Sequence, residues 1–371
     1  MIFVALLSFL IWIYLLGAHG TFWQAGPVLA PAAPVGAPSV AIVVPARDEE
    51  ASIAACLRSL LVQDYRGEFR VILVDDASTD RTADIARALA HPRLTIVTAA
   101  PRPAGWSGKL WAVAQGIAAA DDDTEFYFLT DADITHAPAH LSTLLARAEH
   151  RDLDMVSEMV ALSCDSWAER ALIPAFVFFF QLLYPFARVN DPLSATAAAA
   201  GGTILIRRRA LTRIGGIAAI RGALIDDVAL AKKVKTGGRI WLGHSALAES
   251  VRPYAGPADI WAMIARTAYT QLRYSPTLLA LTGTALIVVW LVPPMAALFA
   301  HGWTQAFATL AWLAAMASYL PTLRRFGRSP AWALALPIIA AFYTAATVAS
   351  AIAHHRGQGT VWKNRAYGAG A

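Results

Sequence analysis

The segment Val40–Glu50 (VAIVVPARDEE) decides the fold, because an apolar strand runs directly into a group of charged residues. A continuous apolar run of this kind is typical of a strand buried on both faces of a sheet. The arrangement recurs at Val71–Asp80 (VILVDDASTD) and Phe126–Asp133 (FYFLTDAD). A further strand is predicted at 94–97, and helices at 51–63, 79–89 and 109–119. Alternating strands and helices predict an α/β fold, with a parallel sheet covered by helices on both faces.

Carboxylates follow three of the predicted strands. Ligands of such sheets bind at the carboxyl ends of the strands, so these acids are candidates for the chemistry. For Glu49 and Asp80, capping of the next helix explains the residue equally well. The close pairs Asp75-Asp76 and Asp131-x-Asp133 are harder to explain in that way, because like charges held together repel and usually need a cation.

The pair Asp131 and Asp133 is the candidate metal site. Residues two apart in an extended chain point to the same side. Carboxylate oxygens suit Mg²⁺ or Mn²⁺, which usually take few protein ligands and complete their shell with substrate phosphates. The sequence therefore predicts Mg²⁺ or Mn²⁺ together with a diphosphate-bearing substrate.

Two helix starts add further candidates. Lys109 in GWSGKLWAVAQGI is the only lysine before position 232, and at a helix N-terminus it either meets a phosphate or is an ordinary surface lysine. Asp226 and Asp227 begin the helix of IDDVALAKKV; capping explains one, and the other is a candidate general base. Before that helix, AAAAGGTILIRRR has small residues that let a ligand approach closely.

Composition places the protein at a membrane. Of 371 residues 57% are hydrophobic and 15% charged, against about 25% charged in ordinary soluble proteins. All 26 acidic residues lie between Asp48 and Asp259, whereas residues 276–371 contain six basic residues and no acid. The basic excess thus accompanies apolar stretches, which indicates membrane flanks and argues against a nucleic-acid partner. Cys56 and Cys164 are expected to be reduced.

The chain divides by hydropathy. We predict a transmembrane anchor at 1–23, a linker at 24–38, a cytoplasmic catalytic domain at 39–275 and a membrane region at 276–371 with spans near 277–300, 304–320 and 331–353. Pro293-Pro294 is expected to interrupt the first of these spans. Basic residues favour the cytoplasmic side. They stand on both sides of the last predicted span, so the number of crossings stays open. These residues are Arg324, Arg325 and Arg328 before the span and Arg356, Lys363 and Arg365 after it. The apolar stretch 171–186 is either an interfacial helix or a buried one.

The segment RTAYTQLRYS (266–275) runs into the first tail span. Arg273 and Tyr274 are either an interfacial anchor or a holder of a diphosphate leaving group.

The ordered motifs VPARDEE, VDDASTD, GKLWAVAQG, TDAD, GGTILIRR, IDDVAL and QLRY resemble the membrane-bound glycosyltransferases of family 2, across about residues 39–275. The resemblance implies a GT-A nucleotide-sugar-binding (Rossmann-like) domain with N- and C-terminal transmembrane helices. RTAYTQLRYS, WKNRAY and the hydrophobic layout are most similar to the hopene-associated glycosyltransferases.

The resemblance also implies roles for individual residues. Residues that would contact the nucleotide are Pro45, Arg47, Glu49, Asp75, Asp76 and Lys109. Asp131 and Asp133 would bind the metal, with Asp131 also near the nucleotide. Asp227 would be the catalytic base, although Asp stands where the family commonly has Glu, so Asp226 remains a second candidate.

Arg273 and Tyr274 would stand at the family's Gln-x-x-Arg-Trp motif. Thr270 occupies the Gln position and Tyr274 replaces Trp. This departure favours a single transfer over processive polymer synthesis.

We therefore predict an inverting, metal-dependent transfer of one sugar from a nucleotide-diphosphate sugar to a membrane lipid, with hopanoid biosynthesis implied by the resemblance. The predicted location is the bacterial inner (cell) membrane, crossed several times, with the catalytic domain cytoplasmic. Polyprenyl phosphate, a ceramide-like lipid and a carotenoid are alternative acceptors. A nucleotidyltransferase or an inactive membrane scaffold is a more distant alternative, and the acidic PARDEE loop disfavours the former.

Overall fold

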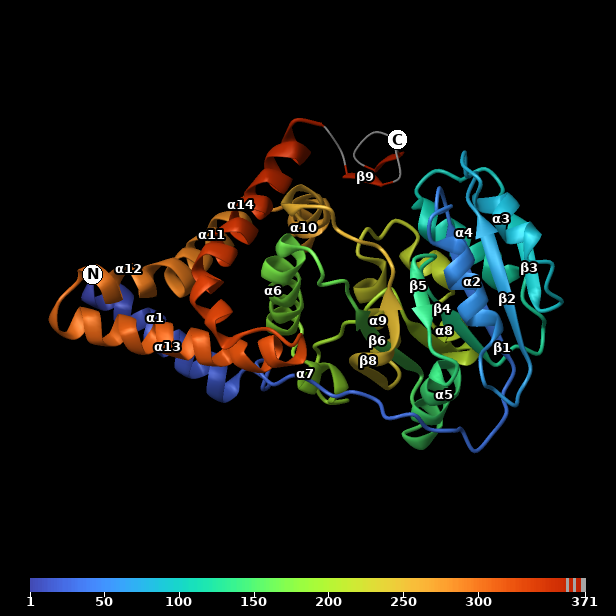
Figure 1. The fold of residues 1–371 in the computed structure, drawn as a ribbon, viewed down its shortest axis with the longest axis horizontal. Coiled ribbons are helices and arrows are strands. Elements are labelled where there is room, and N and C mark those ends of the chain that lie inside the picture. Colours follow the sequence, from blue (N-terminus) through green and yellow to red (C-terminus); the bar gives the residue numbers. More distant parts are fainter. Residues whose placement is uncertain (358–359, 363–364, 368–371) are drawn as a thin grey trace. The chain divides into compact units, whose positions relative to one another are not determined.

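The computed structural model describes residues 1–357, 360–362 and 365–367. The chain forms two compact units, which we describe separately. The sheet unit contains residues 27–163 and 188–253, and the helical unit contains residues 1–26, 164–187 and the described residues from 254 to 367. Figure 1 shows the elements of both units along the chain.

An eight-stranded sheet, in the order β3-β2-β1-β4-β7-β6-β8-β5, forms the centre of the sheet unit. Its strands are β1 (Val40–Ala46), β2 (Phe69–Asp75), β3 (Leu94–Thr98), β4 (Phe126–Leu129), β5 (Ile134–His136), β6 (Met155–Ala161), β7 (Ile204–Arg207) and β8 (Ile240–Ser250). The strands β3, β2, β1 and β4 are parallel, which confirms the prediction for this half. The other half is mixed, since β7 is antiparallel to β4 and β6, and β5 is antiparallel to β8.

Helices cover both faces of the parallel half, as predicted. Alternate side chains of a strand point to opposite faces, and β1 uses both. Ile42 and Val44 pack in a buried cluster with residues of α2 (Ile53–Leu61) and α5 (His140–His150). Val43 faces α4 (Gly108–Ala118), where Gly116 allows the helix to approach the sheet closely. The remaining helices of this unit are α3 (Thr82–Ala88), α8 (Arg208–Arg213), η1 (Ile217–Ile220) and α9 (Asp226–Lys235).

The antiparallel pairing of β7 with β4 determines where the site lies. Leu129, the last residue of β4, is opposite Ile204, the first residue of β7. The turn that precedes β7 therefore meets the chain that leaves β4, so Gly201 and Asp131 line the same pocket.

Within its described residues, the helical unit contains three helices that are long and apolar enough to cross a membrane: Pro276–Phe299, Gly302–Arg325 and Pro330–His355. Their elements are α11 (Pro276–Leu286), η2 (Ile287–Leu291), α12 (Val292–Phe299), α13 (Gly302–Arg325), η3 (Pro330–Ala335) and α14 (Leu336–His355). At the interruption expected at Pro293-Pro294 the helix continues, with a π-helical turn, η2, that ends two residues before Pro293. Proline lacks the N–H that a continuous helix needs.

The N-terminal helix α1 (Ile2–Ala18) has 17 residues. At about 1.5 Å per residue it is roughly 25 Å long, somewhat less than the ~30 Å hydrocarbon core of a bilayer. Within the helical unit, Trp12 Nε1 of α1 donates a hydrogen bond to the Val289 carbonyl, 3.2 Å away. The predicted anchor at 1–23 is thus represented by a short helix that packs on η2.

The apolar stretch 171–186 lies largely in α6 (Trp167–Leu183), which begins with a Ser166/Glu169 capping box. Phe178 packs against Tyr319 with ring centroids 5.1 Å apart, and Tyr343 Oη donates a hydrogen bond to the Leu172 carbonyl. These contacts hold α6 among the apolar helices of its own unit. The remaining helices and strands of the described residues are α7 (Phe186–Asn190), α10 (Pro257–Gln271), β9 (Thr360–Trp362) and β10 (Arg365–Tyr367).

We predict that Gly116→Ala destabilises the protein by about 1–3 kcal/mol, because its Cβ would collide with Val43 Cγ1. The melting temperature of the purified protein should fall. Gly283→Ala is the matched control, because that helical glycine has open space around it and alanine improves helix propensity by about 1 kcal/mol. Equal melting temperatures for wild type and Gly116→Ala would contradict this account of the packing.

Candidate active site

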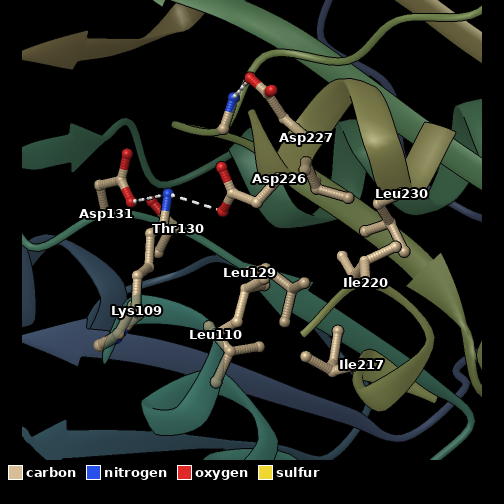
Figure 2. A pocket seen from close by; sticks show the side chains of 14 residues that line it. Lys109, Leu110, Leu129, Thr130, Asp131, Ile217, Ile220, Asp226, Asp227 and Leu230 are labelled. Carbon is tan, nitrogen blue, oxygen red and sulfur yellow. Dashed lines mark hydrogen bonds and ion pairs between the residues drawn. The ribbon is translucent and has the colours of Figure 1, made fainter. Parts of the chain in front are cut away.

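Lys109 is the cation at the centre of the pocket. Ser107 caps α4 by accepting a hydrogen bond from the Leu110 amide, and this places Lys109 in the first helical turn. Its Nζ lies 2.8 Å from Asp131 Oδ1 and 3.4 Å from Asp226 Oδ2 (Figure 2). Burial opposes the charge, but the nearby carboxylates outweigh it and raise the pKa of Lys109. The lysine therefore places a positive charge in the pocket, and its contact with a phosphate stays a prediction.

Asp227 occupies the first turn of α9, beside this ion pair. Its Oδ2 accepts a hydrogen bond from the Gly201 amide at 3.0 Å, and its Oδ1 accepts one from the Val228 amide at 2.7 Å. Burial and the neighbouring charge of Asp226 together raise the pKa of Asp227 to about 7. A carboxyl group with this pKa is suited to accept and release a proton near neutral pH.

The turn before β7 leaves little room for a side chain. A Cβ added at Gly201 would lie 3.3 Å from Lys109 Nζ and 3.6 Å from Asp227 Oδ2. The small residues noted in the sequence thus allow the backbone to approach the charged groups closely. Leu110, Ile204, Ile217 and Leu230 are among the apolar residues that complete the pocket lining.

Arg252, which the sequence did not indicate as a candidate, pairs with two of the predicted site residues. Its Nε donates to Asp133 Oδ2 at 2.7 Å and its Nη2 to Glu49 Oε1 at 2.9 Å. One guanidinium therefore joins the ends of two predicted motifs. The sequence gives only a weak indication of this role, namely that Arg252 is a basic residue just after the end of β8.

The nucleotide-binding candidates occupy the ends of β1 and β2. Arg47 Nη1 donates to the Asp76 carbonyl at 2.6 Å, and the Asp76 amide donates to the Ala46 carbonyl. The side chain of Asp75 accepts a hydrogen bond from the Ser78 amide. Pro45 lines the pocket with Lys109.

Asp80 lies directly before Arg81, the N-cap residue of α3. Its Oδ1 accepts hydrogen bonds from the amide and hydroxyl of Thr82, the first residue of α3. Its other oxygen accepts the Glu50 amide. Asp80 therefore joins two loops and begins a helix.

Arg273 and Tyr274 belong to the helical unit, not to the sheet unit that contains Lys109. Both have positive φ angles, 53° and 55°, just after α10. The Tyr274 ring stacks on His354 with centroids 4.5 Å apart. Their predicted role at a diphosphate stays a prediction.

The carboxylate oxygens of the site are the type of ligand that Mg²⁺ and Mn²⁺ prefer. Asp131, Asp226 and Asp227 are close to one lysine, so the ionised pocket carries excess negative charge. Among the residues that the structure describes, no group of three or more His, Cys, Asp or Glu side chains is arranged to hold a metal. A cation held by one or two carboxylates and by substrate phosphates matches both observations.

Part of the chain is similar to known proteins. Residues 41–215 match the family model "Glycosyl transferase family 2". The 4,4'-diaponeurosporenoate glycosyltransferase of Staphylococcus haemolyticus is 32% identical over 117 residues, 31% of this chain and 30% of that protein. An N-acetylglucosaminyltransferase of Sinorhizobium fredii is 47% identical over 60 residues, 16% of this chain and 14% of that protein. The chain thus matches less than a third of the length of these curated relatives.

A solved structure shares the fold more completely. The mannosyltransferase of Pyrobaculum calidifontis, in complex with GDP-Man and Mn²⁺, superposes with a TM-score of 0.54 over 94% of each chain, at 23% identity. Together with the family match, this similarity assigns the fold. Residues 41–215 thus match the model of glycosyltransferase family 2, and the chain has a GT-A-like fold.

Proposed function

We propose that the protein transfers one sugar from a nucleotide-diphosphate sugar to a hydroxyl or other oxygen nucleophile of a membrane lipid, with inversion at the sugar carbon. The observation that carries the proposal is the position of Asp227. A carboxyl group with a pKa of about 7 lies beside a lysine–carboxylate pair at the edge of a GT-A sheet. That arrangement supplies a base for the acceptor and positive charge for a departing diphosphate.

In this proposal Asp227 takes the proton from the acceptor, and the Gly201 and Val228 amides hold its carboxylate in place. Lys109 faces the diphosphate. A divalent cation held by Asp131 and Asp133 would supply further neutralisation of the leaving group. Arg47, Asp75 and Asp76, with Glu49, would line the nucleotide pocket at the ends of the first two strands.

A lipid acceptor is supported by the helical unit and by one relative. Three helices have the length and composition to cross a membrane. The name of the staphylococcal relative specifies diaponeurosporenoate as its acceptor. That similarity favours a carotenoid-like lipid, whereas the hopene-associated motifs favour a hopanoid. We retain hopanoid glycosylation as the first proposal and carotenoid glycosylation as the alternative.

We also propose a multi-pass protein of the bacterial inner membrane with a cytoplasmic catalytic domain. Arg324 and Arg325 close the α13 helix at its C-terminal end. Basic residues at the ends of membrane helices favour the cytoplasmic side.

The first test is a donor and acceptor screen. We expect the purified protein to release a nucleoside diphosphate from UDP-glucose, UDP-N-acetylglucosamine or GDP-mannose only when a lipid extract is added. Mass spectrometry of the lipid product then separates hopanoid from carotenoid glycosides. A product of nucleotidyl transfer, or no binding of any donor, would contradict the proposal.

The second test identifies the base. Below pH 7 Asp227 becomes protonated and loses its ability to accept a proton, so kcat/KM should fall about tenfold per pH unit. Asp227→Asn should lower kcat by about 10²–10⁴-fold.

Asp226→Asn is the matched variant, because the Asp226 charge helps to raise the Asp227 pKa. It should keep measurable turnover and move the acidic limb of the profile to lower pH. If Asp226→Asn abolishes turnover while Asp227→Asn retains it, the assignment of the base is reversed.

The third test concerns the metal. Removal of divalent ions with EDTA should abolish nucleoside diphosphate release, and Mn²⁺ or Mg²⁺ should restore it. Asp133→Asn should raise the Mn²⁺ concentration needed for half-maximal rate by about 10–100-fold. Asp64→Asn serves as the control, because Asp64 is exposed and belongs to none of the predicted site motifs. Full activity in EDTA would show that Lys109 suffices without a metal.

A further inference from the structure

A buried chain of polar side chains lies behind the pocket, within the sheet unit. Thr130 Oγ1 is 3.0 Å from His136 Nε2, and the Nδ1 atoms of His136 and His140 are 2.8 Å apart. His140 Nε2 is 2.8 Å from Glu158 Oε2, which also accepts the Ser245 hydroxyl at 2.9 Å. All five side chains belong to residues that are at most 4% exposed. Such a chain is costly to bury unless each member is satisfied.

The direction of the chain follows from its first hydroxyl. Thr130 Oγ1 lies 2.8 Å from the Gly202 carbonyl, which can only accept, so the single hydroxyl hydrogen points to Gly202. His136 Nε2 must then carry a hydrogen and donate it to Thr130. A second hydrogen lies between the two Nδ1 atoms, and a third lies between His140 and Glu158.

Two neutral imidazoles supply only two such hydrogens. The third is an additional proton that His140 and Glu158 share. Burial and the neighbouring His140 hold the pKa of His136 well below its usual value, so His136 is neutral and its single hydrogen lies on Nε2. The other ring in contact with both histidines is Phe128, which is uncharged. Without the additional proton, His136 Nε2 would have to accept, and the Thr130 hydroxyl would turn from Gly202 to His136.

Thr130, at one end of this series of side chains, contacts the turn that holds Asp227, the proposed base. Gly202 follows Gly201, whose amide donates to Asp227 Oδ2. Thr130 also precedes Asp131, the carboxylate paired with Lys109. One hydroxyl thus ties the end of β4 to the turn before β7, and these two segments contribute the groups on both sides of Lys109.

We propose that His136, His140 and Glu158 are positioning residues, which direct the Thr130 hydroxyl to the Gly202 carbonyl and thereby orient Gly201 and Asp227. None of them lines the pocket, and each acts through Thr130. The inference rests on the proposed function for its kinetic consequence, but the protonation pattern stands independently of it.

The kinetic test compares three variants in the nucleoside-diphosphate release assay. Thr130→Val removes the hydroxyl at nearly constant shape and should lower kcat by about tenfold while changing the donor KM less than twofold. Thr130→Ser should restore most of kcat. Ser245→Ala is the matched control, since it removes a buried hydrogen bond to the same Glu158 oxygen on the side away from Thr130. It should lower the melting temperature and leave kcat near the wild-type value.

If Ser245→Ala lowers kcat as much as Thr130→Val, or if Thr130→Ser fails to rescue, the cluster has a purely structural role and the proposal is wrong. A KM effect without a kcat effect would also overturn it.

The protonation pattern is tested without any substrate. In protein labelled with ¹⁵N-histidine, assigned by comparison with His136→Asn and His140→Asn, we expect His136 to be protonated at Nε2. Thr130→Val should alter the Nε2 signal of His136. An unprotonated Nε2 on His136 would reverse the hydroxyl direction and overturn the proposal. If no donor reacts in the screen, the proposed function fails, and the ¹⁵N result still decides the hydrogen-bond direction.

Discussion

The contact of Lys109 with two carboxylates is the interaction on which the site depends. Asp131 follows a strand of the parallel half of the sheet, and Asp226 begins a helix almost a hundred residues later. Without the lysine, three neighbouring carboxylates would repel one another, and part of the pocket would be neutral at physiological pH. With it, Asp131 and Asp226 lie beside a fixed positive charge, and Asp227 is left with a pKa near neutrality. The contact with Lys109 therefore distinguishes Asp131 and Asp226, which pair with the lysine, from Asp227, the proposed base.

The mixed sheet makes this contact achievable. In the parallel half, strand ends carry Pro45, Asp75 and Asp131 to one edge. An antiparallel β7 starts at that same edge, so the Gly201-Gly202 turn reaches Asp227 and Thr130 together. The turn is held from both sides by hydrogen bonds, which limits the movement of the proposed base. This rigidity is what a proton transfer with a defined geometry requires.

Much of the fold was predictable because its signals are local. The strands at 40–46, 69–75, 94–98 and 126–129 are short apolar runs, and the helices between them end within a few residues of the predicted limits. The apolar tail helices are equally local signals. Arg252 was not predictable, since its partners Asp133 and Glu49 lie 119 and 203 positions away. The His136–His140–Glu158 chain was missed for a related reason: a histidine gives no sign in the sequence of whether it is buried with a partner.

The sequence by itself determined which acids gather at the edge of the sheet, because parallel strands separated by helices must all end on the same side. It also determined the apolar composition that separates the tail helices from the neutral, acid-containing part of the chain. Only the tertiary structure decided that Asp226, Asp227 and Gly201 join that edge, because the pairing of β7 with β4 is a long-range contact that no local pattern specifies. The tertiary structure also decided the pKa of Asp227, because the pKa of a carboxyl group depends on its burial and on the charges that folding places beside it.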